Sequence, residues 1–243
     1  MEARAPALSG TADSTGMTTF VLIPGAGGNA SLWSLLVPEL ERRGHEAVAV
    51  EIQGDDPALG LSGYADVVLR AMGERPNPVL VAQSLGGFVA ALVARRVPVA
   101  MIVLLNAMVP LPGEAPDEWW DATASGAARR AADLAAGRDT EFDLERHFLH
   151  DLSDEARAAL FAGTPREPSA TAMGERCDFE RWPDVPIRVL VGRDDRFFPA
   201  AFQQRVARDR LGIDADLIGG GHLLALSNAK GLADRLIGYT AGL

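Results

Sequence analysis

The sequence predicts an α/β fold with a mainly parallel, six-stranded sheet covered by helices on both faces. Short, continuous apolar runs alternate with helical patterns along most of the chain. A glycine-rich loop follows the first of these runs, and a serine stands where the third one ends. Continuous apolar strands separated by helices are typical of parallel sheets that are buried on both faces. The length of 243 residues fits a single domain of this class.

The expected elements follow one another in a regular order. Six β-rich apolar runs predict strands at residues 18–23, 46–51, 78–82, 100–106, 186–192 and 215–218. Helical patterns predict helices at residues 31–43, 64–73, 85–97, 200–210 and 230–239. Gly44 is expected to close the first helix.

Two segments lie outside this alternation. Residues 1–17 are rich in Ala, Ser, Thr and Gly and lack the apolar segment of a secretory signal, so we expect a flexible tail before a domain at 18–243. Residues 109–185 are too long for a simple crossover and contain helical patterns at 117–137 and 142–161. We interpret this insertion as a cap over the carboxyl ends of the strands, where open α/β sheets bind ligands. The alternative is a surface subdomain with its own small core.

Composition limits the possible partners. The net charge of −10 argues against nucleic acid or an anionic membrane as a partner. Cys177 is the single cysteine, so no internal disulfide forms, and no segment has the length and apolarity of a membrane span. We therefore expect a cytoplasmic protein that binds a small molecule, as a monomer or a homodimer.

The serine at the end of the third run lies in the stretch Ala82-Gln83-Ser84-Leu85-Gly86-Gly87. A sharp turn from a strand into a helix exposes such a serine above the sheet and needs small residues two positions before and after it. Ala82 and Gly86 satisfy this requirement. The pattern predicts a nucleophile elbow, although an ordinary strand-to-helix turn can produce the same pattern.

An acid and a base follow Ser84 in the order that this architecture uses. Asp194 and Asp195 come directly after the fifth strand, and His222 follows three glycines after the sixth. A serine hydroxyl becomes nucleophilic when a histidine takes its proton and a carboxylate orients that histidine. Because parallel strands end at one edge of the sheet, we expect these side chains to converge there. The residues alone leave both Asp194 and Asp195 open as the acid.

The glycine loop at residues 24–28 has two interpretations. It can form an oxyanion hole, with the backbone N–H groups of Ala26 and Leu85 as donors. It also matches the dinucleotide-binding pattern G-x-G-x-x-A, with Glu51 at the end of the next strand. We favour the oxyanion hole and expect no cofactor, because the second interpretation leaves the serine, acid and histidine unexplained.

The histidines of the insertion are a weaker candidate site. His147, His150 and Asp151 are three to four positions apart, but no further ligand cluster supports a metal site. We expect no bound metal and a hydrogen-bonding role for His150.

Together these motifs resemble the α/β-hydrolase superfamily, most closely its esterase and hydroxynitrile-lyase group. The resemblance rests on residues 23–27, 82–87, 192–199 and 221–227. It implies the α/β-hydrolase fold with a helical cap, and hydrolysis of small carboxylic esters without a cofactor. The family spacing places the acid four residues before a proline, which favours Asp195 over Asp194.

Three departures within this superfamily bear on the reaction. Cyanogenic lyases of the group typically have threonine and lysine where this chain has Gly25 and Leu223, which favours hydrolysis. Relatives that act on haloalkanes or epoxides use aspartate where this chain has Ser84.

The resulting hypothesis is a bacterial serine hydrolase acting on a small, largely apolar ester, with Ser84, His222 and Asp195 as the triad. Two alternatives are a lyase, thioesterase or elimination enzyme of secondary metabolism that uses the same triad, and a non-catalytic small-molecule receptor. Residues near the motifs are expected to contact the substrate: Gly25, Met108, Trp119, Trp120, Phe197, Phe198 and Leu223.

Overall fold

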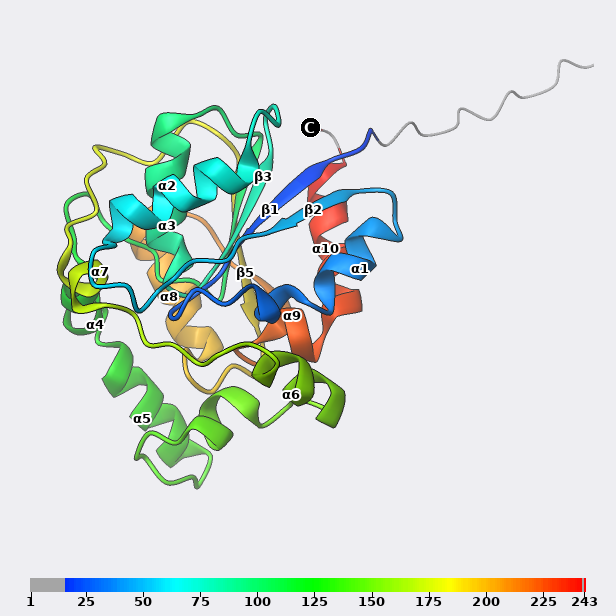
Figure 1. Ribbon diagram of the computed structural model, residues 1–243. Helices are drawn as coiled ribbons and strands as arrows, with labels where there is room; N and C mark the ends of the chain where they lie inside the picture. Colours follow the sequence, from blue (N-terminus) through cyan, green and yellow to red (C-terminus); the bar gives the residue numbers. More distant parts are fainter. Residues whose placement is uncertain (1–15, 242) are drawn as a thin grey trace, which may run out of the picture.

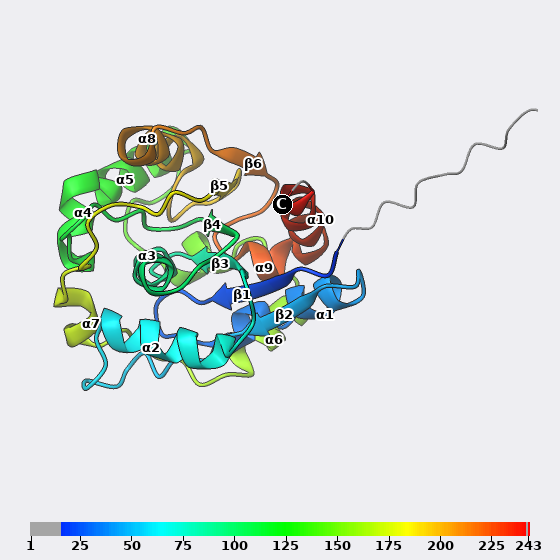
Figure 2. The same ribbon diagram turned by 90° about the horizontal axis from the view of Figure 1, so that it is seen from above.

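A computed structural model describes residues 16–241 and residue 243, so nearly all of the expected tail (1–17) lies outside the described residues. Within them, six strands form one sheet in the order β2-β1-β3-β4-β5-β6. The sheet runs through the middle of the molecule (Figure 1), and each strand is labelled in Figure 2. All neighbouring strands are parallel, which confirms the predicted sheet. The strands are β1 (Thr19–Ile23), β2 (Glu46–Ala49), β3 (Val79–Gln83), β4 (Met101–Leu105), β5 (Ile187–Gly192) and β6 (Asp216–Ile218).

Helices cover both faces of the sheet because the strands are apolar on both sides. In β1, Phe20 and Leu22 face one core cluster, whereas Val21 and Ile23 face the other. The cluster that Val21 and Ile23 face includes apolar residues of α2 (Leu61–Met72), α3 (Gly86–Arg96) and α8 (Ala200–Leu211). The cluster that Phe20 and Leu22 face includes apolar residues of α1 (Leu36–Glu41), α9 (Leu224–Ser227) and α10 (Ala229–Thr240). The two sets of helices therefore lie on opposite sides of the sheet (Figure 2). No helix in the described part of the chain is long and apolar enough to cross a bilayer.

The first helical region differs from the prediction. A continuous helix was expected at residues 31–43, but the structure has a 3-10 turn, η1 (Ala30–Trp33), followed by α1. Pro38 explains the break, because it has no N–H to donate to the carbonyl of Ser34. The chain restarts with Pro38 in the first turn of α1 and leaves the helical region at Gly44, whose φ is +85°.

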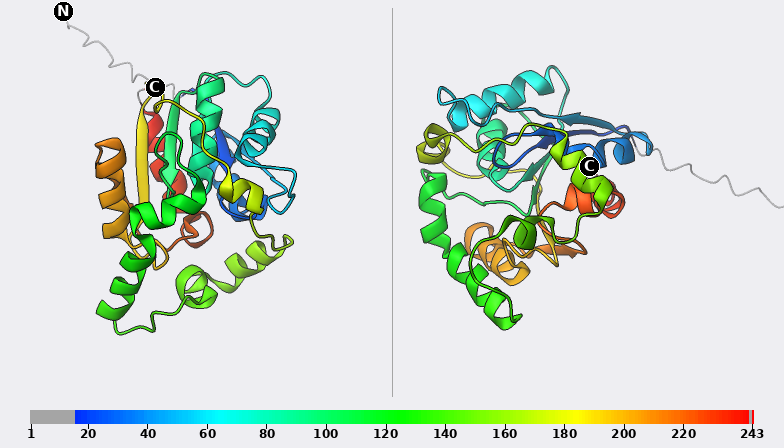
Figure 3. Two further views of the ribbon diagram at one scale, coloured as in Figure 1. Left: turned by 90° about the vertical axis from the view of Figure 1, so that its left-hand side faces the viewer. Right: turned by 60° about the horizontal axis from the view of Figure 1, so that its bottom comes forward.

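The insertion contains short helices joined by irregular segments. They are α4 (Pro116–Thr123), α5 (Ser125–Ala135), the π-helical turn η2 (Glu145–Leu149), α6 (Asp154–Phe161) and α7 (Ala170–Gly174). Each of the two predicted helical patterns is divided, the first at Ala124, which has a left-handed φ of 55°. The insertion lies beyond the carboxyl ends of the strands (Figure 3).

A buried ion pair ties the insertion to α8. The Arg210 guanidinium binds the Glu114 carboxylate and donates to the Val109 carbonyl at 2.7 Å, and both charged side chains are at most 8% exposed. We expect Arg210→Met to lower the free energy of unfolding by about 3–5 kcal/mol, because Glu114 is left charged and unpaired. Urea unfolding measures this loss.

Arg208→Met is the matched control. Arg208 lies on the same helix and pairs with Asp214, but both side chains are exposed (62% and 82%). Exposed pairs contribute about 0–1 kcal/mol. Similar losses in the two variants would contradict a stabilising role for the buried pair.

Candidate active site

Ser84 lies on a sharp turn between β3 and α3. Its φ is +52°, a left-handed backbone conformation that residues other than glycine seldom adopt. The neighbouring backbones pass in contact: a Cβ on Gly86 would lie 2.8 Å from the Pro24 carbonyl oxygen, and one on Gly87 would lie 2.0 Å from that of Met108. The turn therefore has the strand–turn–helix geometry of a nucleophile elbow.

His222 is buried and bonded to one of the two candidate acids. Its Nδ1 lies 2.8 Å from Oδ2 of Asp195. The ring also packs edge-on against Phe148, Phe197 and Phe198, with centroids 4.8–5.2 Å apart. The imidazole is thus fixed in position and shielded from solvent.

Asp195 is held by four hydrogen bonds. Oδ1 accepts from the backbone N–H groups of Phe197 and Phe198 at 2.9 and 2.8 Å. Oδ2 accepts from Nε2 of Gln203 at 3.1 Å, in addition to its bond with His222. Asp194 is exposed, and its Oδ2 accepts from the Gly220 N–H at 2.9 Å. Of the two aspartates, Asp195 is therefore the one in contact with the histidine.

Ser84 and His222 line one cavity of about 450 Å³. Both predicted oxyanion residues, Ala26 and Leu85, line it too. Nε2 of His222 is buried and has no hydrogen-bond partner among the described residues. A free imidazole nitrogen and a serine hydroxyl in one cavity are the parts that base-assisted nucleophilic attack requires.

The predicted substrate contacts divide into two groups. The cavity wall includes Gly25, Met108, Trp120, Phe197 and Leu223. Trp119 and Phe198 do not line this cavity. They are almost fully buried and pack on each other with ring centroids 5.3 Å apart, and each also contacts Trp120. They therefore support the wall from behind.

Two positioning residues were missed by the sequence analysis. Asn106 follows β4 with a φ of +43°, and its Nδ2 donates to the carbonyls of Gly221 and His222 at 3.0 Å. Its Oδ1 accepts from the Gly192 N–H at 2.7 Å, so one amide joins the two loops that hold the acid and the base. A polar residue ending a buried strand is a signal that could have revealed it. Gln203 gave no such signal, because a glutamine in an amphipathic helix is ordinary.

The glycine loop is covered by the chain itself. A Cβ on Gly27 would lie 2.4 Å from the Arg166 carbonyl oxygen of the insertion. The Arg166 guanidinium donates to the Ile52 carbonyl at 2.6 Å and pairs with Glu51, whose other oxygen accepts from the Ala30 N–H at 2.6 Å. Groups of the protein thus bind both oxygens of the Glu51 carboxylate, which would bind a ribose in the dinucleotide interpretation.

The histidines of the insertion do not converge. His147 is buried, and its Nε2 lies 3.1 Å from Oδ2 of Asp133. His150 lines a different cavity, and burial lowers the pKa of its imidazole. Among the residues that the structure describes, no group of three or more His, Cys, Asp or Glu side chains is arranged to hold a metal ion.

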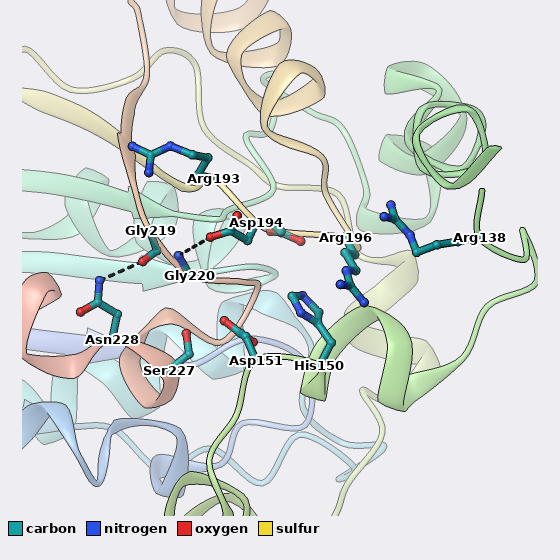
Figure 4. A pocket seen from close by; sticks show the side chains of 11 residues that line it. Arg138, His150, Asp151, Arg193, Asp194, Arg196, Gly219, Gly220, Ser227 and Asn228 are labelled. Carbon is teal, nitrogen blue, oxygen red and sulfur yellow. Dashed lines mark hydrogen bonds between the residues drawn. The ribbon is translucent and has the colours of Figure 1, made fainter. Parts of the chain in front are cut away.

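That second cavity, of about 690 Å³, lies beside the loops that carry Asp195 and His222 (Figure 4). Asp151 of the insertion points to the histidine loop there, and its Oδ2 accepts from the Gly221 N–H at 2.5 Å. A Cβ on Gly221 would lie 2.8 Å from Oδ1 of the same carboxylate. The insertion therefore contacts the histidine loop at two points, through Phe148 on the His222 ring and through Asp151 on Gly221.

We expect Asp151→Ala to lower kcat by about tenfold with a smaller change in KM, because a loosened loop misplaces the imidazole. Asp151→Asn should recover most of the rate, since an amide oxygen still accepts from the Gly221 N–H. Steady-state kinetics on one substrate checks both variants. Equal losses in Asp151→Ala and Asp151→Asn would show that the hydrogen bond is not the cause.

Comparisons with known proteins agree with this architecture. The model of the alpha/beta hydrolase family matches residues 20–235. An extracellular alpha/beta-hydrolase from a Paenibacillus species is 21% identical with a TM-score of 0.73, covering 91% of this chain and 98% of its own. A pyrethroid hydrolase from Sphingobium faniae is 19% identical (TM-score 0.72; 93% and 98% covered), and a methylesterase from Arabidopsis is 17% identical (0.72; 93% and 100%). A search of curated protein sequences finds no match.

Proposed function

The chain belongs to the alpha/beta hydrolase family, and from this premise we propose that it is a serine esterase acting on a small, largely apolar carboxylic ester. The observation that carries the proposal is the pairing of His222 with Asp195 beside the cavity that Ser84 lines. Nε2, the nitrogen of His222 not bound to Asp195, is free to act as a base. This arrangement meets the chemical needs of acyl transfer through a covalent intermediate.

In the proposed reaction, Nε2 of His222 takes the proton of the Ser84 hydroxyl as its oxygen attacks the acyl carbon. The negative charge that develops on the carbonyl oxygen is stabilised by the backbone N–H groups of Ala26 and Leu85. The tetrahedral intermediate collapses, the C–O bond to the alcohol breaks, and the imidazolium protonates the leaving alcohol. Water, deprotonated by His222, then releases the acid from Ser84.

Asp195 acts on His222 in both steps. Its carboxylate accepts the Nδ1–H, which leaves Nε2 without a proton before attack and stabilises the imidazolium afterwards. The two backbone N–H donors and Gln203 fix the carboxylate in place. Surrounding phenylalanine rings exclude water, so the ion pair formed in the transition state is weakly screened.

The cavity wall supports a small, largely apolar substrate. A volume of about 450 Å³ lies within the usual range for small-molecule sites. Aliphatic and aromatic side chains predominate in the wall, among them Leu32, Met108, Trp120, Phe142, Phe148, Leu160, Met173 and Phe197. Proteins named as a pyrethroid hydrolase, a polyneuridine aldehyde esterase and a methylesterase share the fold, which favours an ester among the possible substrates.

Labelling with a fluorophosphonate tests the nucleophile. We expect one label per chain, on the peptide that contains Ser84, and hydrolysis of short-chain nitrophenyl esters by the unlabelled protein. A label on another peptide would refute the assignment of the nucleophile. Labelling of Ser84 without steady-state turnover of any ester would instead support the receptor alternative.

A further inference from the structure

Asn29 occupies a helix-capping position but does not cap. It precedes η1, and asparagine is among the residues that most often bond the free N–H groups at a helix start. Here its side chain makes no such bond, and the N–H of Ala30 is satisfied by Glu51 at 2.6 Å instead. The Asn29 amide is therefore available for another contact.

This amide lies in the wall of the active-site cavity. Its Oδ1 is buried and has no hydrogen-bond partner within the described residues. A buried amide oxygen without a partner is unfavourable, and departures from local rules of this kind tend to occur at functional positions. Asn29 lines the same cavity as Ala26 and Ser84.

Two other polar side chains of the wall make hydrogen bonds or ion pairs within the protein. Gln83 donates to the His222 carbonyl at 3.5 Å, and Arg166 is engaged with Glu51 and the Ile52 carbonyl. Glu167 is exposed. Asn29 differs from Gln83 and Arg166, because its Oδ1 is buried and has no hydrogen-bond partner among the described residues.

We propose that Asn29 binds a hydroxyl group of the substrate, so that the preferred ester is hydroxylated. An amide offers an acceptor, Oδ1, and a donor, Nδ2, and a hydroxyl can satisfy both. The amide is uncharged, which suits a neutral partner within apolar walls better than a carboxylate or an ammonium group. The inference rests on the proposed esterase function and specifies its substrate class.

Matched esters test the inference. Nitrophenyl esters are prepared with a hydroxyl at successive carbons of a short acyl chain, each beside its O-methyl ether and its unsubstituted parent. For at least one position, kcat/KM of the hydroxylated ester should exceed that of both partners by about tenfold or more, because the ether cannot donate and the parent leaves the amide unpaired. Alkyl esters with a hydroxyl on the alcohol extend the series to the leaving group.

Substitutions of Asn29 test whether this residue causes the preference for hydroxylated esters. Asn29→Leu and Asn29→Ala should reduce the hydroxyl preference to about twofold or less, the second without added bulk. Gln53→Leu is the control, an exposed amide outside the cavity wall, and it should keep the wild-type preference. A preference that survives both Asn29 variants, or a wild-type protein that hydrolyses all esters alike, overturns the inference. Failure to hydrolyse any ester refutes the esterase proposal instead.

Discussion

Ser84→Ala is expected to lower kcat for ester hydrolysis by about a millionfold, to the level left by binding and the oxyanion hole. Without the hydroxyl no acyl-enzyme forms, while the cavity and the Asp195–His222 pair are unchanged. The variant should fold, since alanine meets the same backbone strain as serine at a φ of +52°. Hydrolysis of a nitrophenyl ester, with a thermal melt on the same sample, measures both properties.

Ser34→Ala provides the comparison. Ser34 is exposed on the surface, and its hydroxyl bonds only to the Ser31 carbonyl within the described chain. Its activity should stay within about twofold of wild type, as expected for a surface substitution. A folded Ser84→Ala protein with the activity of Ser34→Ala would disprove the assigned nucleophile.

Asp195→Asn is expected to lower kcat by about ten-thousandfold. Two backbone N–H groups point at the Oδ1 position, so the oxygen of the new amide must take that place. Its NH2 group then faces Nδ1 of His222, which has to become an acceptor. The ring proton moves to Nε2, and the histidine can no longer take the serine proton.

Asp194→Asn separates this effect from a general change of charge in the loop. Asp194 accepts from the Gly220 N–H, which an amide oxygen can also do. The kcat of Asp194→Asn should remain within about threefold of wild type, in line with other surface substitutions. A large loss at position 194 together with a small one at 195 would exchange the roles of the two residues. The same ester assay compares both.

The sheet was predictable because its strands are continuous apolar runs. The predicted ends of β3 and β4 differ from the observed ones by only one residue. The agreement is close because a strand that is buried on both faces is apolar along its whole length. The insertion was less predictable. Ala124 adopts a left-handed conformation without the glycine that usually signals one, so the division between α4 and α5 has no local marker.

The order of the motifs predicted where the candidate site lies, but not which of several neighbouring side chains belong to it. The sequence placed Ser84, the acid and His222 at one sheet edge, but the choice between two adjacent aspartates depends on the turn after β5. Likewise, Trp120 and Phe197 line the cavity while their neighbours Trp119 and Phe198 do not. Which member of such an aromatic pair faces the cavity depends on tertiary packing, and periodicity alone does not record it.

The left-handed backbone at position 84 lowers the stability of the fold, whereas the serine side chain there is needed for the proposed reaction. A glycine there would relieve about 1 kcal/mol of conformational strain while removing the hydroxyl of the proposed nucleophile. Ser84→Gly should therefore melt at a higher temperature than the alanine variant, although both lack the hydroxyl. In a related sequence, glycine at this position would indicate loss of the proposed nucleophile together with a gain in stability.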